Sequence, residues 1–212
     1  MDGRSGLGAA EDEARSARSV ERTETFSDAV LAIIITLLVL DLKPPQIEPG
    51  HLLRGLLEEW PAYLAYATSF LNLAAIWLAH RYVFERIRAT SPPLNWANLA
   101  ILFSSALVPF PTAVVARFLK AGNQGDIQTA IALYALVGAL MLTSAWIFYQ
   151  YAVRHPELIH AGAGKYLRQE RTKAMIGTAL FLGGGLFGYV SPWIAFALFL
   201  AVPLYTGITT PR

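Results

Sequence analysis

Long apolar runs alternate with short polar segments along this chain of 212 residues. Six runs stand out, over residues 26–42, 61–80, 96–119, 129–151, 174–190 and 193–209. A helix needs roughly 20 apolar residues to cross the hydrocarbon core of a bilayer, where free backbone groups find no partners. The pattern therefore predicts an all-α integral membrane protein with six transmembrane helices.

Prolines and short connections refine this prediction. Pro109 and Pro111 lie inside the third run, so we expect that helix to kink or to end its regular part early. Only Ser191 and Pro192 separate the last two runs, which predicts a tight antiparallel pair. The segment 44–60 has leucines at helical spacing and predicts one short amphipathic helix outside the membrane.

Charged residues make up 15% of the chain, whereas a soluble domain usually carries about 25%. They gather in residues 1–24, 80–88 and 154–173, between the apolar runs. Residues 1–24 contain little apolar surface and are expected to form a flexible cytoplasmic tail. Residues 25–210 are then expected to form one six-helix transmembrane domain.

The placement of Lys and Arg predicts the orientation in the membrane. With six spans, 13 of the 17 basic residues fall on one side, which is the cytoplasmic side by the positive-inside rule. Both termini are therefore expected in the cytoplasm of a multi-pass protein of the cell membrane, with the lipid bilayer as its surroundings.

Composition and missing motifs exclude several functions. The chain has no cysteine, which excludes disulfides and thiolate metal sites, and its net charge of +2 does not favour a nucleic-acid partner. It also lacks an H-E-x-x-H motif, a G-x-S-x-G elbow and a P-loop. We therefore expect no enzyme activity, no bound metal and no cofactor.

The first run carries the most informative polar residues. Arg22, Phe26, Ser27 and Asp28 form an R-x-x-x-F-S-D pattern at its start. A buried carboxylate needs a cation or several donors nearby, because it otherwise takes up a proton. The candidate partners of Asp28 near the cytoplasmic side are Arg22, His80, Arg81 and Asn98. The hypothesis is that Arg22, Ser27 and Asp28 pin the first helix to the second and third.

This pattern, with the I-x-x-T-L-L-x-L-D run that follows it, resembles the signature of the transmembrane protein 175 family of potassium channels. The segment from Trp77 to His80 and the segment from Asn98 to Phe110 add to the resemblance, which covers roughly the first half of the chain. It implies that Trp77, His80 and Asn98 are possible partners of the motif. It also implies a homotetramer in which the first helix of each subunit lines a central pore for potassium.

The resemblance further implies that side chains of the first helix narrow the pore, at positions Ile33, Thr36 and Leu40. On a helical wheel at about 100° per residue, these three and Leu37 share one face, and Asp28 lies near 220° from Ile33. If Ile33 faces the pore, Asp28 faces its own subunit. Asp28 is then an anchor and not a pore carboxylate.

Other interpretations of the same residues remain open. Ile33 and Leu40 also suit a face in contact with lipid or another helix, and Thr36 also suits a bond to the carbonyl one turn earlier. His80 is either a hydrogen-bonded interface residue or a pH sensor. The alternative function is a secondary transporter for a cation or small solute. Such transporters usually need several intramembrane acids or histidines, and here Asp28 is the single carboxylate well inside a predicted span.

Overall fold

The computed structural model describes residues 3–209, apart from the side chains of residues 3–10, 12 and 209. Residues 1–2 and 210, which the predicted tail and domain include, lie outside the described residues. The described chain is helical, with short turns between its elements. In order these are α1 (Gly3–Leu37), the 3-10 turn η1 (Leu38–Asp41), α2 (Leu52–Glu58), α3 (Trp60–Phe84), α4 (Pro92–Ala106), α5 (Pro109–Ala121), α6 (Gln124–Arg154), the 3-10 turn η2 (Pro156–Leu158), α7 (Gly164–Phe187) and α8 (Pro192–Thr209).

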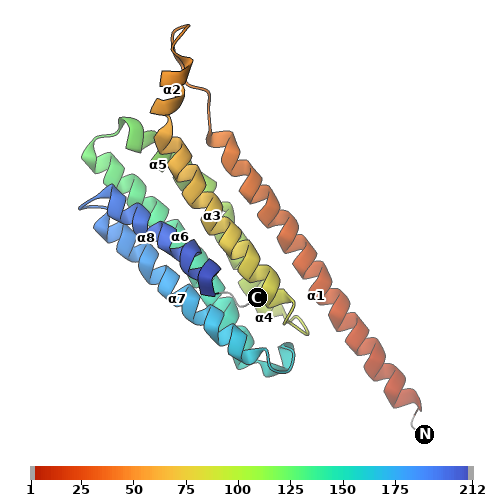
Figure 1. Ribbon diagram of the computed structural model, residues 1–212. Coiled ribbons are helices and arrows are strands. Elements are labelled where there is room, and N and C mark those ends of the chain that lie inside the picture. Colours follow the sequence, from red (N-terminus) through yellow and green to blue (C-terminus); the bar gives the residue numbers. More distant parts are fainter. Residues whose placement is uncertain (1–2, 210–212) are drawn as a thin grey trace.

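The helices form one bundle with α1 along its edge (Figure 1). α7 packs along α6 and α8, and α8 also contacts α3. α1 packs against α3 and α4, and its N-terminal end lies at the end of the bundle opposite α2 (Figure 1). This arrangement confirms the all-α prediction and leaves one long side of α1 without a neighbour among the described residues.

The third predicted run is broken at its prolines, as expected. α4 ends at Ala106 and α5 begins at Pro109, because a proline ring inside a helix removes one hydrogen bond and clashes with the carbonyl four residues earlier. The two parts still form one apolar stretch, Pro92–Ala121. The predicted kink is confirmed.

Four helical stretches of the described chain are long and apolar enough to cross a membrane, namely Glu13–Asp41, Trp60–Phe84, Pro92–Ala121 and Gln124–Arg154. The apolar helix Pro192–Ile208 is shorter. α7 begins with a polar third, so it does not reach the same hydropathy. The crossing of the membrane by α7 and α8 therefore stays a prediction.

Two helices, α1 and α7, begin much earlier than the sequence predicted. α1 is continuous from Gly3, so the range 1–24 is helical in its described part, and its flexibility stays a prediction. Ala, Glu and Arg are frequent there and favour helix. α7 begins at Gly164 and not near residue 174, and its first turns bury Glu170 and Lys173, whose Oε1 and Nζ lie 2.7 Å apart. The ion pair makes the burial of these two charges tolerable. The apolar pattern of the sequence alone did not predict that α7 extends over these charged residues.

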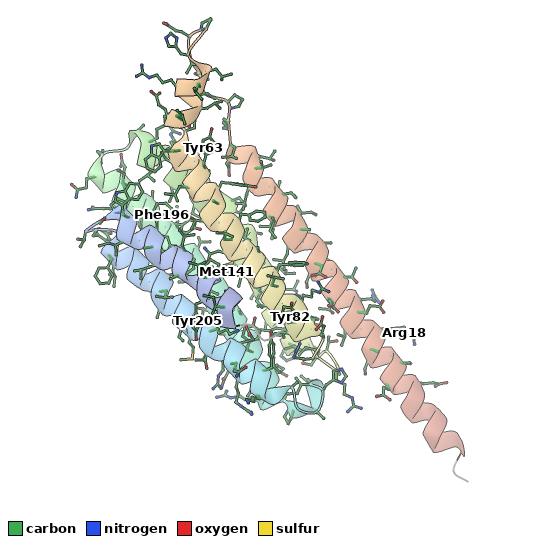
Figure 2. All side chains as sticks on the ribbon, viewed as in Figure 1. Arg18, Tyr63, Tyr82, Met141, Phe196 and Tyr205 are labelled. Carbon is green, nitrogen blue, oxygen red and sulfur yellow. The ribbon has the colours of Figure 1, made fainter. Side chains whose placement is uncertain are left out.

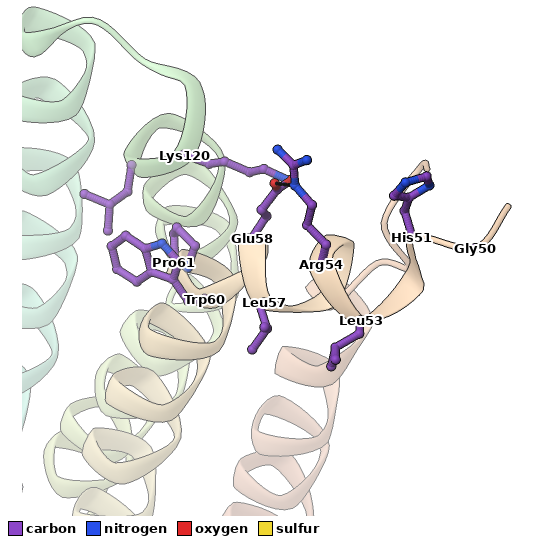
Figure 3. Close-up of a pocket in the computed structure, with 10 residues that line it drawn as sticks. Gly50, His51, Leu53, Arg54, Leu57, Glu58, Trp60, Pro61 and Lys120 are labelled. Carbon is purple, nitrogen blue, oxygen red and sulfur yellow. Dashed lines mark hydrogen bonds and ion pairs between the residues drawn. The ribbon is translucent and has the colours of Figure 1, made fainter. Parts of the chain in front are cut away.

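The predicted amphipathic helix outside the membrane is α2, at the end of the bundle away from the N-terminus (Figure 1). It borders a cavity of about 720 Å³ with the start of α3 and the end of α5. Figure 3 shows Leu53 and Leu57 on one side of α2 and Arg54 and Glu58 on the other. Arg54 Nε donates to Glu58 Oε1 at 2.8 Å, so the charges beside this cavity are paired.

Candidate functional site: the two faces of α1

The two long sides of α1 have opposite surroundings. Leu31, Ile34 and Leu38 are buried against the bundle. Ile33 is 59% exposed and Leu40 67% exposed, although both are large apolar residues in a helix apolar enough to span a membrane. Only 22% of the apolar window of α1 is buried, compared with 61% for α6, so α1 is the span with the most surface left for contacts outside the chain.

The exposed residues include all four of the predicted pore positions. Thr36 and Leu37 lie exposed beside Ile33 and Leu40. The α-helix tightens into the 3-10 turn η1 from Leu38, and residues three apart eclipse one another in such a turn. Leu40 therefore continues the line of Leu37, and the stripe runs unbroken to the end of the helix.

Thr36 uses its hydroxyl hydrogen within the helix. Its Oγ1 donates to the Ile33 carbonyl at 2.8 Å, which is the bond to the preceding turn that its position also suited. The hydroxyl has one hydrogen to donate, so its lone pairs remain available on the exposed face. Thr36 can therefore offer an oxygen ligand to a cation on that side, and the backbone bond does not exclude this role.

On the buried side, a directed chain of hydrogen bonds joins three helices. The hydroxyl of Ser27 donates to the Thr23 carbonyl at 2.8 Å, and its Oγ accepts from Asn98 Nδ2 at 2.8 Å. Asn98 Oδ1 lies 2.9 Å from His80 Nε2. Since Asn98 already donates through its nitrogen, its oxygen accepts, which assigns the proton to His80 Nε2. Ser27, His80 and Asn98 are all buried, so this chain ties α1 to α4 and α4 to α3.

Asp28 makes a second bond between α1 and α3, with Trp77, one of the residues that the family resemblance implies as partners of the motif. Its Oδ1 accepts from Trp77 Nε1 at 3.0 Å. Arg22, His80, Arg81 and Asn98 form no ion pair or hydrogen bond with Asp28 itself in the described structure, although Asn98 and His80 hold the motif through Ser27. An indole donor satisfies the half-buried carboxylate without a second charge having to leave water. Trp77 precedes His80 by one helical turn, so both residues face α1 from the same side of α3.

The remaining motif residues lie on the open side of α1. Phe26 is 53% exposed, and Arg22 is exposed without an ion pair to any described residue. Ser27 and Asp28 are thus brought together with Trp77, His80 and Asn98, whereas Arg22 and Phe26 are not. The part of the chain that the structure describes contains no cluster of three His, Asp or Glu side chains suited to a metal ion.

Comparisons with known proteins agree with this arrangement. The family model described as "Endosomal/lysosomal potassium channel TMEM175" matches residues 22–109, which include both faces of α1 and the partners of its motif. A potassium channel of Streptomyces collinus is 34% identical over 191 residues, which cover 88% of this chain and 90% of that protein. A potassium channel of Chamaesiphon minutus is 31% identical over 194 residues, which cover 88% of this chain and 93% of that protein.

A solved structure shares the fold. It is the crystal structure of a homologue, from Chamaesiphon minutus, of a lysosomal potassium-selective channel TMEM175. It superposes with a TM-score of 0.76 at 30% sequence identity and covers 90% of this chain and 97% of that one. With a family match on the motif and relatives similar over almost their whole length, the chain belongs to the TMEM175 family of membrane ion channels.

Proposed function

We propose that this protein is a potassium-selective channel that conducts passively through a central pore lined by α1. Its relatives of similar length are named potassium channels, and the superposed structure is that of a homologue of a potassium-selective channel. The pore forms between four copies of the chain in the cell membrane, with both termini in the cytoplasm. Potassium is the permeant ion, and conduction requires no enzymatic step.

The observation that carries the proposal is the exposed stripe of Ile33, Thr36, Leu37 and Leu40. The opposite side of the same helix is packed and hydrogen-bonded within the subunit. A helix that is anchored on one side and apolar on the other suits a position between its own subunit and a central axis. Four such helices then present rings of Ile33, Thr36 and Leu40 to the pore.

A ring of apolar side chains selects ions through the cost of removing their water. A narrow apolar neck expels water, and an ion crosses it only if it sheds or rearranges its hydration shell cheaply. Potassium holds its water less tightly than sodium, so the neck favours potassium. The Thr36 oxygens replace part of the lost hydration one turn beyond Ile33, which we propose as the narrowest point.

The test is ion flux from liposomes that contain the purified protein, loaded with potassium or with sodium. We expect potassium efflux well above sodium efflux, and a lower potassium/sodium ratio for Ile33→Ala. Ile147→Ala is the matched control, because Ile147 is 47% exposed on α6, away from the stripe. It should keep the ratio of the unsubstituted protein.

Two results would count against the proposal. If Ile33→Ala keeps both conductance and selectivity, the constriction lies elsewhere. If neither ion flows passively but an imposed proton or sodium gradient drives uptake, the protein is a secondary transporter, and the exposed stripe is a contact surface only.

A further inference from the structure

A basic groove lies between α1 and α4, near the end of α1 that precedes the motif. It encloses about 650 Å³. Its α1 wall contains three arginines within two helical turns, Arg15, Arg18 and Arg22. Figure 2 shows Arg18 at the level of Tyr82, at the end of the bundle where α3 finishes. The α4 wall is polar and contains Asn95, whose Oδ1 is buried without a partner among the described residues, and Asn98.

The three arginines have no carboxylate partner among the described side chains of their own subunit. None of them forms an ion pair with a described residue, and all three are exposed. Two acids of the same stretch of α1 face elsewhere, whereas Glu11 falls within about 40° of Arg15 on the helical wheel and forms no ion pair with a described residue. Glu13 Oε1 lies 3.8 Å from Arg88 Nη2 in the loop after α3, and Glu24 lies close to Asp28 and Glu85. Three arginines against Glu11 therefore leave an excess of positive charge on the groove side of α1.

The groove lies on the same side of α1 as the proposed pore stripe. α1 is one uninterrupted α-helix from Gly3 to Leu37, so a single helical wheel gives the directions of its side chains along its whole length. At about 100° per residue, Arg15 falls at the angle of Ile33, five turns earlier, and Arg22 falls within about 20° of it. If Ile33 faces the pore, Arg15 and Arg22 face the cytoplasmic mouth of that pore.

We infer that Arg15, Arg18 and Arg22 form a binding site for a soluble anion that carries several phosphate groups. Guanidinium groups bind phosphate oxygens in pairs through a planar set of N–H donors. The rise from Arg15 to Arg22 is about 10 Å, which three flexible side chains can bring together around a chain of linked phosphates. A single small anion cannot contact all three at once.

The site deepens the proposed function, on which its place at the pore mouth rests. Without an anion, a ring of arginines repels potassium that approaches from the cytoplasm. A bound polyphosphate cancels this charge and raises the local concentration of cations. A lipid headgroup offers similar phosphate chemistry, but a groove that faces the pore axis is open to water rather than to lipid.

The experiment is calorimetric titration of the full-length channel with sodium triphosphate in nanodiscs of phosphatidylcholine only. We expect binding that weakens as salt increases. The Kd should rise about tenfold in Arg15→Gln and in Arg18→Gln, since each variant loses a charge-assisted contact. Arg117→Gln is the control, because Arg117 lies on α5 near the opposite end of the bundle, and it should bind triphosphate like the unsubstituted channel.

Three outcomes would overturn the inference. Equal triphosphate affinity in Arg18→Gln would show that the groove is not the site. Loss of triphosphate binding in nanodiscs that contain phosphatidylglycerol would show that lipid headgroups are the occupant. No triphosphate binding, together with weaker tetramers in Arg18→Gln, would show that the arginines pair with a neighbouring copy.

These experiments can refute the anion site and the proposed channel function independently of each other. Triphosphate binding without potassium flux would refute the proposed channel function and keep the anion site. Potassium-selective flux without triphosphate binding would refute the anion site alone.

Discussion

Asn98→Ala is expected to loosen the attachment of α1 more than any other single truncation on α4. The side chain of Asn98 is the middle of the buried chain between Ser27 and His80, with bonds of 2.8 and 2.9 Å. Its removal leaves the buried His80 Nε2–H without an acceptor and the Ser27 oxygen without its donor. The remaining bond of Ser27 to the Thr23 carbonyl does not depend on Asn98.

The size of the effect follows from these two losses. Hydrogen bonds between membrane helices contribute about 0.6 kcal/mol each on average, which gives about 1.2 kcal/mol for the pair. A buried donor left without an acceptor costs about 1–3 kcal/mol. We expect a loss of about 2 kcal/mol in the free energy of unfolding per subunit, or about 30-fold in the equilibrium constant.

The assay is unfolding of the purified protein in mixed micelles by increasing SDS, with size-exclusion chromatography to follow assembly. Asn95→Ala is the matched control, because Asn95 lies one turn earlier on α4 and its Oδ1 has no partner among the described residues. A double-mutant cycle between Ser27→Ala and Asn98→Ala should reveal a coupling of about 1 kcal/mol. An equal loss in the free energy of unfolding for Asn98→Ala and Asn95→Ala would refute the role of this hydrogen-bond chain.

Two further predictions concern the packing of α7. A Cβ at Gly138 would overlap the ring of Phe181, so Gly138→Ala should lower stability by about 1–3 kcal/mol, whereas Gly183→Ala, whose nearest neighbour would be 3.9 Å away, should be nearly neutral in the same SDS assay. Glu170→Gln leaves Lys173 as a buried cation without its carboxylate and should cost about 3–5 kcal/mol. The double variant Glu170→Gln/Lys173→Met should recover part of that loss in thermal unfolding, and a double variant as unstable as the single one would contradict this account.

The sequence predicted the general architecture because hydropathy reports it directly. Apolar runs of sufficient length give helices in a bilayer, and the prolines at 109 and 111 gave the break between α4 and α5. The shared face of Ile33 and Leu40 was also predictable, since helical periodicity fixes which residues lie together. That these residues point away from their own subunit needed the structure, because an apolar stripe alone does not say what covers it.

Polar details were harder to predict, because they depend on contacts between distant segments. The family resemblance implied Trp77, His80 and Asn98 as partners of the motif, but which of them bonds Asp28 and which bonds Ser27 needed the structure. The burial of Glu170 with Lys173 was missed for a related reason. Charged residues at the end of a predicted span usually lie in water. Here the packing of α7 against α6 and α8 keeps water away from Glu170 and Lys173.

The bonds on the buried side of α1 matter for the pore because they fix the rotation of this helix. Relative to Ile33, Ser27 lies at about 120° and Asp28 at about 220°, so the two bonds hold α1 from either side of its packed face. A rotation by one residue would exchange Ile33 for the buried Ile34. Either bond alone still opposes that rotation, so losing one of them should lower stability before it alters selectivity. The motif therefore serves the proposed pore, because Ile33 can form the constriction only while the bonds of the motif hold the rotation of α1 about its own axis.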